Sequence, residues 1–274
     1  DYYKQASVPK KVENAKVVEI YSGYNQNYGI TEDGSILTWG LKGYLLGSDN
    51  LGRDIFDRAL NGGRMSMTIG AVAVIIATVI GVIVGGVSGF FGGKIDMILQ
   101  RISEIIGALP FLPFVMILSS LIGNAMTSQQ RVYLIMVILG LLSWTSLQRL
   151  VRAQVLSVRE QEYVIAAKAL GIKQINIIFK HIIPNVISVI LVNATLNFAT
   201  SMLTEATLSY LGFGVQPPIP TWGNMLFGSN DSIVIQNFWW RWVYVAAIFG
   251  ICVICINLIG DGLRDAIDPK SQER

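Results

Sequence analysis

The chain has 274 residues, of which 52% are hydrophobic and 14% are charged, and its mean hydropathy is +0.52. Soluble domains carry about a quarter charged residues, so this composition excludes an ordinary soluble domain and indicates a membrane protein. The formal net charge is only +3. This value excludes the strongly basic surface of a nucleic-acid-binding protein, and we expect no nucleic acid among the partners.

The first 44 residues predict a small extracellular β element. Segments 15–23 and 28–39 alternate between apolar and polar side chains, and Asp33-Gly34 is typical of a hairpin turn. A lone hairpin has marginal stability, so we expect it to lean on a neighbouring segment.

Residues 45–64 predict an amphipathic helix at the outer membrane surface. Asp49 has the side chain of a helix cap, and Asp54 precedes Arg58 by four residues, the spacing of an ion pair on one helix face. We expect this helix to lead into the first transmembrane span.

Five segments without charged residues follow, and about 20 apolar residues suffice to cross the hydrocarbon core. We therefore predict an all-α polytopic membrane protein whose transmembrane domain occupies residues 65–274. The five predicted spans are 65–93, 105–123, 132–148, 182–203 and 242–260.

The first span carries a small residue at every fourth position, a pattern that lets two helices approach closely in lipid. Tight static packing and a helix that slides during a working cycle are both open interpretations. Pro110 and Pro113 are expected to bend the second span. The four small residues of the first span are Gly81, Gly85, Gly89 and Gly93.

The charged segment 157–183 lies between two apolar spans. Ser157 and Glu160 have the spacing of a capping box, and Gly171 suits the left-handed position that ends a helix. A second helical pattern follows, and Pro184 fits the first turn of the next span. We predict two short amphipathic helices on the cytoplasmic side. Their apolar faces are Tyr163, Ala166, Ala167 and Leu170 in the first, and Ile172, Ile175, Ile178, Phe179 and Ile182 in the second.

Two roles for these helices remain open. Helices of this kind rest on lipid in some proteins. The narrow face of alanine and tyrosine suits a close protein partner better than lipid, which favours docking of a cytosolic protein. His181 is the only histidine, and we expect it to be a polar group at the inner interface. The sequence offers no catalytic constellation and no metal-ligand cluster, so we expect neither catalytic nor metal-binding residues.

The fourth span carries a polar stripe that broadens into neighbouring threonines. Polar groups inside a membrane face a cavity or a partner helix, so the stripe is either the lining of a hydrated path or hydrogen-bonding contact between helices. Lining is the favoured interpretation, with Glu205 as its main residue. The stripe consists of Asn193, Asn197, Ser201 and Glu205.

Two further patterns lie in the last third of the chain. The three prolines after the fourth span predict an extended, stiff outer loop. Cys252 and Cys255 form a C-x-x-C pattern among isoleucine and valine, and we interpret them as small apolar residues on a helix face rather than as a redox or metal site. The prolines are Pro217, Pro218 and Pro220.

Basic residues gather on one side of the predicted spans, eleven against only Arg131 and Arg241 on the other. The positive-inside rule makes the richer side cytoplasmic and places the first 64 residues outside. Because an outer segment of this length needs an exporting signal, we expect a sixth span before Asp1. The eleven are Lys94, Arg101, Arg149, Arg152, Arg159, Lys168, Lys173, Lys180, Arg264, Lys270 and Arg274.

The segment from Glu162 to Pro184 resembles the cytoplasmic coupling loop of binding-protein-dependent ABC importer permeases. That loop has the pattern E-A-A, three residues, Gly, nine residues, I-x-L-P, and this chain has Ile165-Ala166-Ala167, Gly171 and His181-Ile182-Ile183-Pro184. The acid and the later isoleucine are replaced, and Glu162 lies one helical turn before the missing acid. Segments 45–60, 208–226 and 260–270 resemble the C-type permease subunit of oligopeptide and dipeptide importers.

This resemblance covers the chain from about residue 45 onward and implies a type I ABC importer permease fold in the bacterial plasma membrane. It implies that the subunit forms half of a path for oligopeptides or dipeptides and is not itself an enzyme. The implied partners are a homologous second permease subunit, two cytosolic ABC ATPases that bind ATP and Mg²⁺, an extracellular substrate-binding protein and membrane lipid. The implied coupling residues are Glu162, Tyr163, Ala166, Ala167, Lys168, Gly171, Lys173 and Pro184.

Three other functions are weighed against this one. A permease for nickel chelates or another small solute shares the same family pattern. An ion-coupled secondary transporter would favour inverted repeats and midplane charges, which the sequence does not show. A membrane scaffold or substrate-capture protein would use the outer β element as its working part. Capture of two ATPase subunits by the intact chain separates the importer from the last two.

Overall fold

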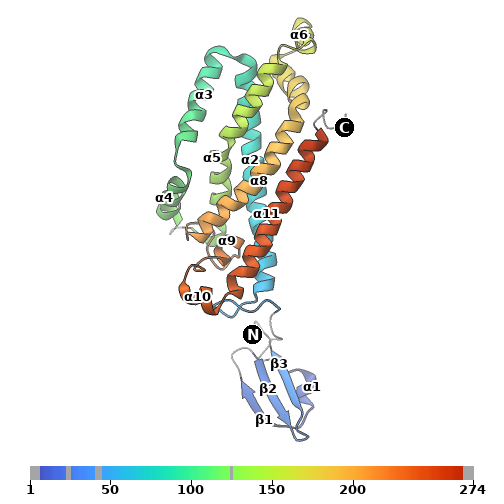
Figure 1. Cartoon of the computed structure of the whole chain (residues 1–274), viewed down its shortest axis with the longest axis vertical. Helices are drawn as coiled ribbons and strands as arrows, with labels where there is room; N and C mark the ends of the chain where they lie inside the picture. Colours follow the sequence, from blue (N-terminus) through green and yellow to red (C-terminus); the bar gives the residue numbers. More distant parts are fainter. Residues whose placement is uncertain (1–6, 23–25, 41–44, 124–125, 268–274) are drawn as a thin grey trace. The chain divides into compact units, whose positions relative to one another are not determined.

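The computed structural model describes residues 7–22, 26–40, 45–123 and 126–267. The chain divides into two compact units, Asp1–Asp57 and Arg58–Arg274. The first unit contains the short helix α1 and a three-stranded sheet, and the second contains the long helices (Figure 1). The expected combination of a small N-terminal β element with a helical membrane domain is confirmed.

The N-terminal sheet is an antiparallel meander in the order β1-β2-β3. The turn between β2 and β3 contains Asp33-Gly34, and Gly34 adopts a φ of 80°, a left-handed conformation that glycine adopts without steric cost. The predicted hairpin is therefore present, and a third strand, β1, supports it by pairing with β2. The elements are α1 Lys10–Glu13, β1 Val17–Ser22, β2 Gln26–Thr31 and β3 Ile36–Gly40.

Four helices of the second unit are long and apolar enough to cross a membrane, and a bent pair, α3 and α4, makes a fifth candidate span. The long helices α2, α5, α8 and α11 run side by side (Figure 1). This arrangement agrees with the five predicted spans. The helices are α2 Ile55–Phe91, α3 Gly93–Ala108, α4 Phe111–Gly123, α5 Ser128–Val158, α6 Glu162–Ala169, α7 Gln174–Asn176, the π-helical η1 Ile177–Ile182, α8 Ile183–Tyr210, α9 Trp222–Met225, α10 Ser232–Asn237 and α11 Trp240–Ile267.

The helix predicted for residues 45–64 starts later than expected, because α2 begins at Ile55, and it continues without a break into the first span. The cap is also different. The Asp54 carboxylate accepts a hydrogen bond from the Phe56 amide at 2.8 Å, whereas Asp49 closes the preceding turn by accepting from the amide and Nε of Arg53. The capping residue of this helix is therefore Asp54 rather than Asp49.

The second span is bent as predicted, and the break comes at Pro110. Helices α3 and α4 meet at an angle of 74°. Proline has no amide hydrogen and disfavours a helical conformation in the residue before it, so α3 ends at Ala108. Pro113 lies in the first turn of α4, where proline is tolerated. Because α3 begins at Gly93, this candidate span also starts earlier than the predicted 105–123.

The segment 157–183 differs from the predicted pair of separate helices. Ser157 remains inside α5, and the N-cap of α6 is Gln161, so the capping box at Ser157 is wrong. The second helix is not separate either, since α7, η1 and α8 form one run from Gln174 to Tyr210. Pro184 does lie in the first turn of α8.

Helices α2 and α5 pack backbone to backbone along the glycine ladder. A Cβ atom on Gly85 would lie 2.7 Å from the Gln148 carbonyl oxygen, and one on Gly89 would lie 2.8 Å from that of Arg152. Gly81 faces the same helix at 3.2 Å. Gly93 does not belong to this contact, because it starts α3 with a φ of 54°. The ladder therefore supports tight packing over three of its four positions.

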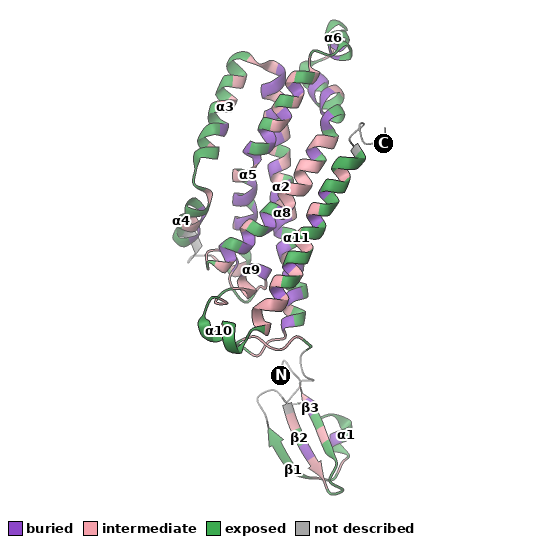
Figure 2. Ribbon diagram, viewed as in Figure 1, coloured by how far each residue is buried: buried purple, intermediate pink, exposed green. Residues whose placement is uncertain are grey.

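Buried residues of the second unit gather where α2, α5 and α8 meet, whereas much of α3 is exposed (Figure 2). One cluster lies at the α6 end and includes Val155, Val164 and Ile178. Another includes Ile69, Leu139 and Leu208. The core thus consists of two apolar layers connected by the α2–α5 contact.

We expect Gly85→Ala to lower the stability of the protein by about 1–3 kcal/mol, because the added methyl group collides with the backbone of α5. The measurement is thermal unfolding of the purified subunit in detergent. Gly250→Ala in α11 is the matched control, since no described atom lies within 4 Å of its added carbon and alanine favours the helix. Equal stability of the two variants would contradict the packing role of the ladder.

Candidate functional site

Helix α6 lies at one end of the helical unit, and α9 and α10 lie at the other (Figure 1). The α6 end carries Arg152, Arg159 and Lys168, so the positive-inside rule makes it the cytoplasmic end. We call the α9 end the outer end. These two ends contain the two groups of predicted site residues.

Helix α6 buries one narrow edge. Val164 and Ala167 pack into the apolar cluster with Val155 and Ile178. The predicted apolar face of α6 is therefore corrected: of its members, Ala167 is buried, while Tyr163, Ala166 and Leu170 are exposed. Val164 and Ala167 are three residues apart and therefore lie on the same side of the helix. Two such side chains are enough to attach α6 to the core, because the helix has only eight residues.

Several apolar side chains of this region are exposed. Leu170 is 81% exposed, the largest fraction in the group. The second predicted face is divided in the same way, since Ile178 and Ile182 are buried but Ile175 and Phe179 are exposed. The exposed group, which we call the α6 apolar patch, consists of Tyr163, Ile165, Leu170, Ile175 and Phe179.

Two polar contacts attach α6 to the membrane helices. The Asn185 side-chain amide of α8 donates to the Tyr163 hydroxyl at 3.2 Å. The Lys168 ammonium lies 4.9 Å from the centre of the Phe90 ring at the end of α2, a cation–π contact. A displacement of α6 would therefore reach both α2 and α8.

The turn after α6 has the predicted geometry. Gly171 has a φ of 73°, its amide donates to the Lys168 carbonyl at 3.0 Å, and the Ile172 amide donates to the Ala167 carbonyl at 3.2 Å. This pair of bonds is the Schellman arrangement that closes a helix. Glu162 lies exposed in the first turn of α6, and Lys173 is the exposed N-cap of α7.

An ion pair and a hydrogen bond from an arginine to a backbone carbonyl connect the helix ends near α6. The Arg152 guanidinium of α5 binds the Asp96 carboxylate of α3 with two hydrogen bonds of 2.6 Å. Arg159 donates to the Gly89 carbonyl of α2 at 3.2 Å. Paired, two-point contacts of this kind fix orientation as well as distance, so α6 projects from a rigid base.

The polar stripe of α8 divides into a buried and an accessible part. Glu205 and Ser201 are buried, whereas Asn193 and Asn197 are partly accessible and hydrogen-bonded to each other at 2.7 Å. Thr200, Thr204 and Thr207 extend the accessible part, and each hydroxyl donates to a carbonyl one turn earlier. In this structure Glu205 lies inside the subunit, where its contacts are those of the alternative interpretation, hydrogen bonding between helices.

Pro217 and Pro218 lie exposed in a loop at the outer end of the subunit, but residues on both sides of them are buried. Val215 and Trp222 are buried, and the Trp222 indole donates to the Ala59 carbonyl of α2 at 2.9 Å. A capping box of Thr221 and Asn224 starts α9. Sequence reasoning missed Ser66, Ser209 and Trp222 as partners in this region. Ser209 had a usable signal, since it lies one helical turn after Glu205.

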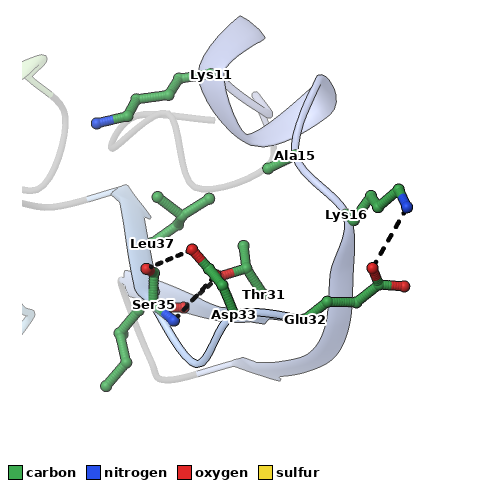
Figure 3. A pocket seen from close by; sticks show the side chains of 9 residues that line it. Lys11, Ala15, Lys16, Thr31, Glu32, Asp33, Ser35 and Leu37 are labelled. Carbon is green, nitrogen blue, oxygen red and sulfur yellow. Dashed lines mark hydrogen bonds and ion pairs between the residues drawn. The ribbon is translucent and has the colours of Figure 1, made fainter.

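The N-terminal sheet has a surface hollow at its β2–β3 turn (Figure 3). Asp33 accepts hydrogen bonds there from the Thr31 hydroxyl and from the amide and hydroxyl of Ser35. These bonds hold the pKa of Asp33 below its usual value, the Thr31 hydroxyl contributing most. Because the Asp33 carboxylate stabilises the β2–β3 turn through these hydrogen bonds, its presence in the hollow is explained by the fold and indicates no ligand site. Its lining is Lys11, Ala15, Lys16, Thr31, Glu32, Asp33, Ser35, Ile36 and Leu37.

Within the described residues, no group of three or more His, Cys, Asp or Glu side chains has the arrangement of a metal site. Cys252 and Cys255 are free thiols on α11, and Cys255 is exposed. Their interpretation as small apolar residues stays a prediction.

The chain is similar to several known proteins. The oligopeptide transport system permease protein OppC of Bacillus subtilis is 41% identical over 84% of this chain and 72% of its own length. The dipeptide transport system permease protein DppC of the same organism is 40% identical over 82% of this chain and 68% of its own length. A structure of the MetNI methionine ABC transporter in inward-facing conformations matches with a TM-score of 0.60 and 20% identity, over 78% of this chain and 97% of that chain.

The MetNI likeness shows the fold alone, and it confirms the expected type I importer architecture. The match to the family described as "Binding-protein-dependent transport system inner membrane component" extends over residues 77–273, which include α6, the whole of α8 and the last span. The chain therefore belongs to this family and is a multi-pass permease subunit of the bacterial inner membrane.

Proposed function

We propose that this subunit forms half of a path through which an ATP-driven importer moves oligopeptides or dipeptides into the cell. The observation behind this proposal is the α6 apolar patch. It exposes apolar side chains around α6, and α6 contacts both α2 and α8. The relatives named as oligopeptide and dipeptide permeases support the choice of substrate.

In this proposal the α6 apolar patch is the seat of a cytosolic ATPase. Leu170 and Ile165 offer apolar anchors, and Glu162 and Lys173 offer charges at the rim. Such a combination of a desolvated centre and a polar rim is typical of a protein interface. Two ATPases, each with bound ATP and Mg²⁺, would serve this subunit and a homologous second permease. ATP hydrolysis then belongs to those partners, and this chain catalyses no reaction.

Movement of the ATPases would reach the membrane through the attachments of α6. Val164 and Ala167 pack against the core, Lys168 contacts Phe90 of α2, and Tyr163 accepts a hydrogen bond from α8. A helix packed in this way moves its neighbours rather than deforming, because protein interiors have low compressibility. The two permeases would then open alternately toward each side, and an extracellular binding protein would deliver the substrate.

The accessible side of α8 is the proposed wall of the path. Its polar groups are neutral amides and hydroxyls, from Asn193 and Asn197 to the threonines near the outer end. Neutral donors and acceptors can match a peptide backbone without selecting one side-chain charge. This property suits an importer whose binding protein sets the selectivity.

Reconstitution of the complete complex in proteoliposomes tests the proposal. The expected result is ATP-dependent accumulation of labelled di- and oligopeptides delivered by the binding protein. Accumulation of a nickel chelate without peptide uptake would assign the other substrate class, and uptake driven by an ion gradient without ATP would exclude the importer.

We expect Gly171→Val to insert normally but to retain the ATPases poorly and to transport little. A β-branched residue at a φ of 73° costs about 1–2 kcal/mol, which would distort the turn beside the α6 apolar patch. Gly171→Asn is the matched control, because asparagine tolerates the left-handed conformation. The measurement is co-purification of the ATPases with each variant. Equal retention by both variants would show that the turn is not needed for docking.

We expect Leu170→Asp to weaken ATPase binding about tenfold or more, as loss of an interface anchor does. The carboxylate would have to be desolvated against the partner, whereas the free subunit should tolerate it at 81% exposure. Ile36→Asp in the N-terminal sheet changes another exposed aliphatic side chain and should leave binding unchanged. Titration of the ATPase onto membranes measures the affinity, and an unchanged value for Leu170→Asp would place the docking surface elsewhere.

A further inference from the structure

Glu205 is the only acidic residue of α8, and it is completely buried. Both oxygens of its carboxylate accept hydrogen bonds from serine hydroxyls. Ser209 of α8 donates to Oε1 at 2.7 Å, and Ser66 of α2 donates to Oε2 at 3.0 Å. Burying an acidic side chain costs free energy unless the group is paired or hydrogen-bonded. The question is therefore what function these hydrogen bonds have in the fold.

Each of the two serine oxygens also accepts a backbone amide from the folded-back segment. The Val215 amide donates to Ser209 Oγ at 3.0 Å, and the Trp222 amide donates to Ser66 Oγ at 3.2 Å. A serine hydroxyl has one hydrogen and two lone pairs. Because its hydrogen is committed to the carboxylate, a lone pair remains for the amide. One carboxylate thus orients two hydroxyls, and through them it binds both ends of segment 215–222.

We propose that Glu205 is a positioning residue that fastens both ends of segment 215–222 to α2 and α8 through Ser66 and Ser209, and so fixes the outer end of the permease. The role goes beyond the proposed transport of peptides. It also differs from lining the path, because the carboxylate acts inside the subunit on a segment of its own chain.

The segment is tightly packed against its surroundings. A Cβ atom on Gly63 would lie 2.6 Å from the Trp222 ring, and one on Gly223 would lie 2.6 Å from the Ala206 backbone. The Asn224 side-chain amide holds the interior of the segment by donating to the Val215 and Ile219 carbonyls at 3.1 and 2.7 Å. The exposed Pro217 and Pro218 lie between the two fastened ends. The segment is thus a stiff loop held at its two ends and, between them, by the Ser128 hydroxyl of α5, which donates to the Pro217 carbonyl at 3.2 Å.

The chemistry requires a carboxylate at position 205. Each oxygen of the Glu205 side chain accepts a serine hydroxyl, so the residue at this position must offer an acceptor at both places. The amide of glutamine would offer N–H to one of the two serines. That serine can accept the N–H with its second lone pair, but its own hydrogen then loses its acceptor inside the protein, which costs free energy. Glu205→Gln should therefore weaken one arm, and Glu205→Leu should remove both.

The experiment measures how often segment 215–222 detaches from α2 and α8 and exposes a buried position. In the complete complex with Cys252→Ala and Cys255→Ala, Val215→Cys places a thiol at a position that is 1% exposed. Cysteine is tolerated at buried apolar positions. The rate of its reaction with a membrane-impermeant maleimide is then measured in right-side-out vesicles. Four further changes are compared in this background: Glu205→Gln, Glu205→Leu, Ser209→Ala and Ser88→Ala.

We expect Ser209→Ala and Glu205→Gln to raise the labelling rate about fivefold, the factor for one hydrogen bond, and Glu205→Leu to raise it further. Ser88→Ala is the matched control, because Ser88 is a buried serine of α2 whose hydroxyl donates to the Gly85 carbonyl and accepts from Gln148 of α5, and neither partner belongs to segment 215–222. It should leave the rate unchanged. Parental rates in both Glu205→Gln and Ser209→Ala would overturn the proposal, and so would an equal rise in Ser88→Ala, which would indicate general loosening.

If Glu205→Leu fails to assemble, Ser209→Ala and Glu205→Gln still decide the outcome. The labelling needs neither substrate nor ATP. A parental complex that fails to import peptides would therefore reject the proposed function and leave the labelling result intact.

Discussion

The close approach of α2 and α5 is the contact on which the rest of the permease unit depends. In lipid, helices gain little from burying apolar surface against each other, so backbone proximity and hydrogen bonds must hold them together. The ladder of Gly81, Gly85 and Gly89 supplies that proximity. The ends of the same two helices carry the ion pair to α3, the bond from Arg159 to the Gly89 carbonyl and the Phe90 ring that contacts α6. The α6 region is thus supported by a seam with little freedom to deform.

The two ends of the unit use polar groups in opposite ways. At the cytoplasmic end, charges and an exposed apolar patch surround a helix that only a narrow edge holds to the core. At the outer end, a buried carboxylate and two serines hold a loop inward. This contrast suits a subunit that receives motion at one end and keeps a fixed shape at the other. On α8 itself, the acidic residue is buried inside the subunit, whereas the neutral polar residues Asn193 and Asn197 are partly accessible.

Sequence reasoning succeeded where a local signal decides the structure. The five apolar segments, the bend at Pro110, the turn at Gly171 and the Asp33-Gly34 hairpin each follow from composition or backbone preference within a few residues. It failed where two local signals competed. Ser157 has a capping spacing, but α5 continues through it to Val158. Asp49 and Asp54 both suit a cap, and only the fold decides that Asp54 starts α2.

The sequence by itself determined the membrane class, the number of candidate spans, the basic side and the glycine positions, because hydropathy, charge and small side chains act through the bilayer on each segment independently. The tertiary structure decided which edge of α6 is buried, that Val215 and Trp222 on either side of the exposed prolines are buried, and that the Glu205 carboxylate accepts hydrogen bonds from two serines. Those outcomes depend on groups far apart in the chain, such as Ser66 and Glu205, and no periodicity within one helix encodes the distance between two helices.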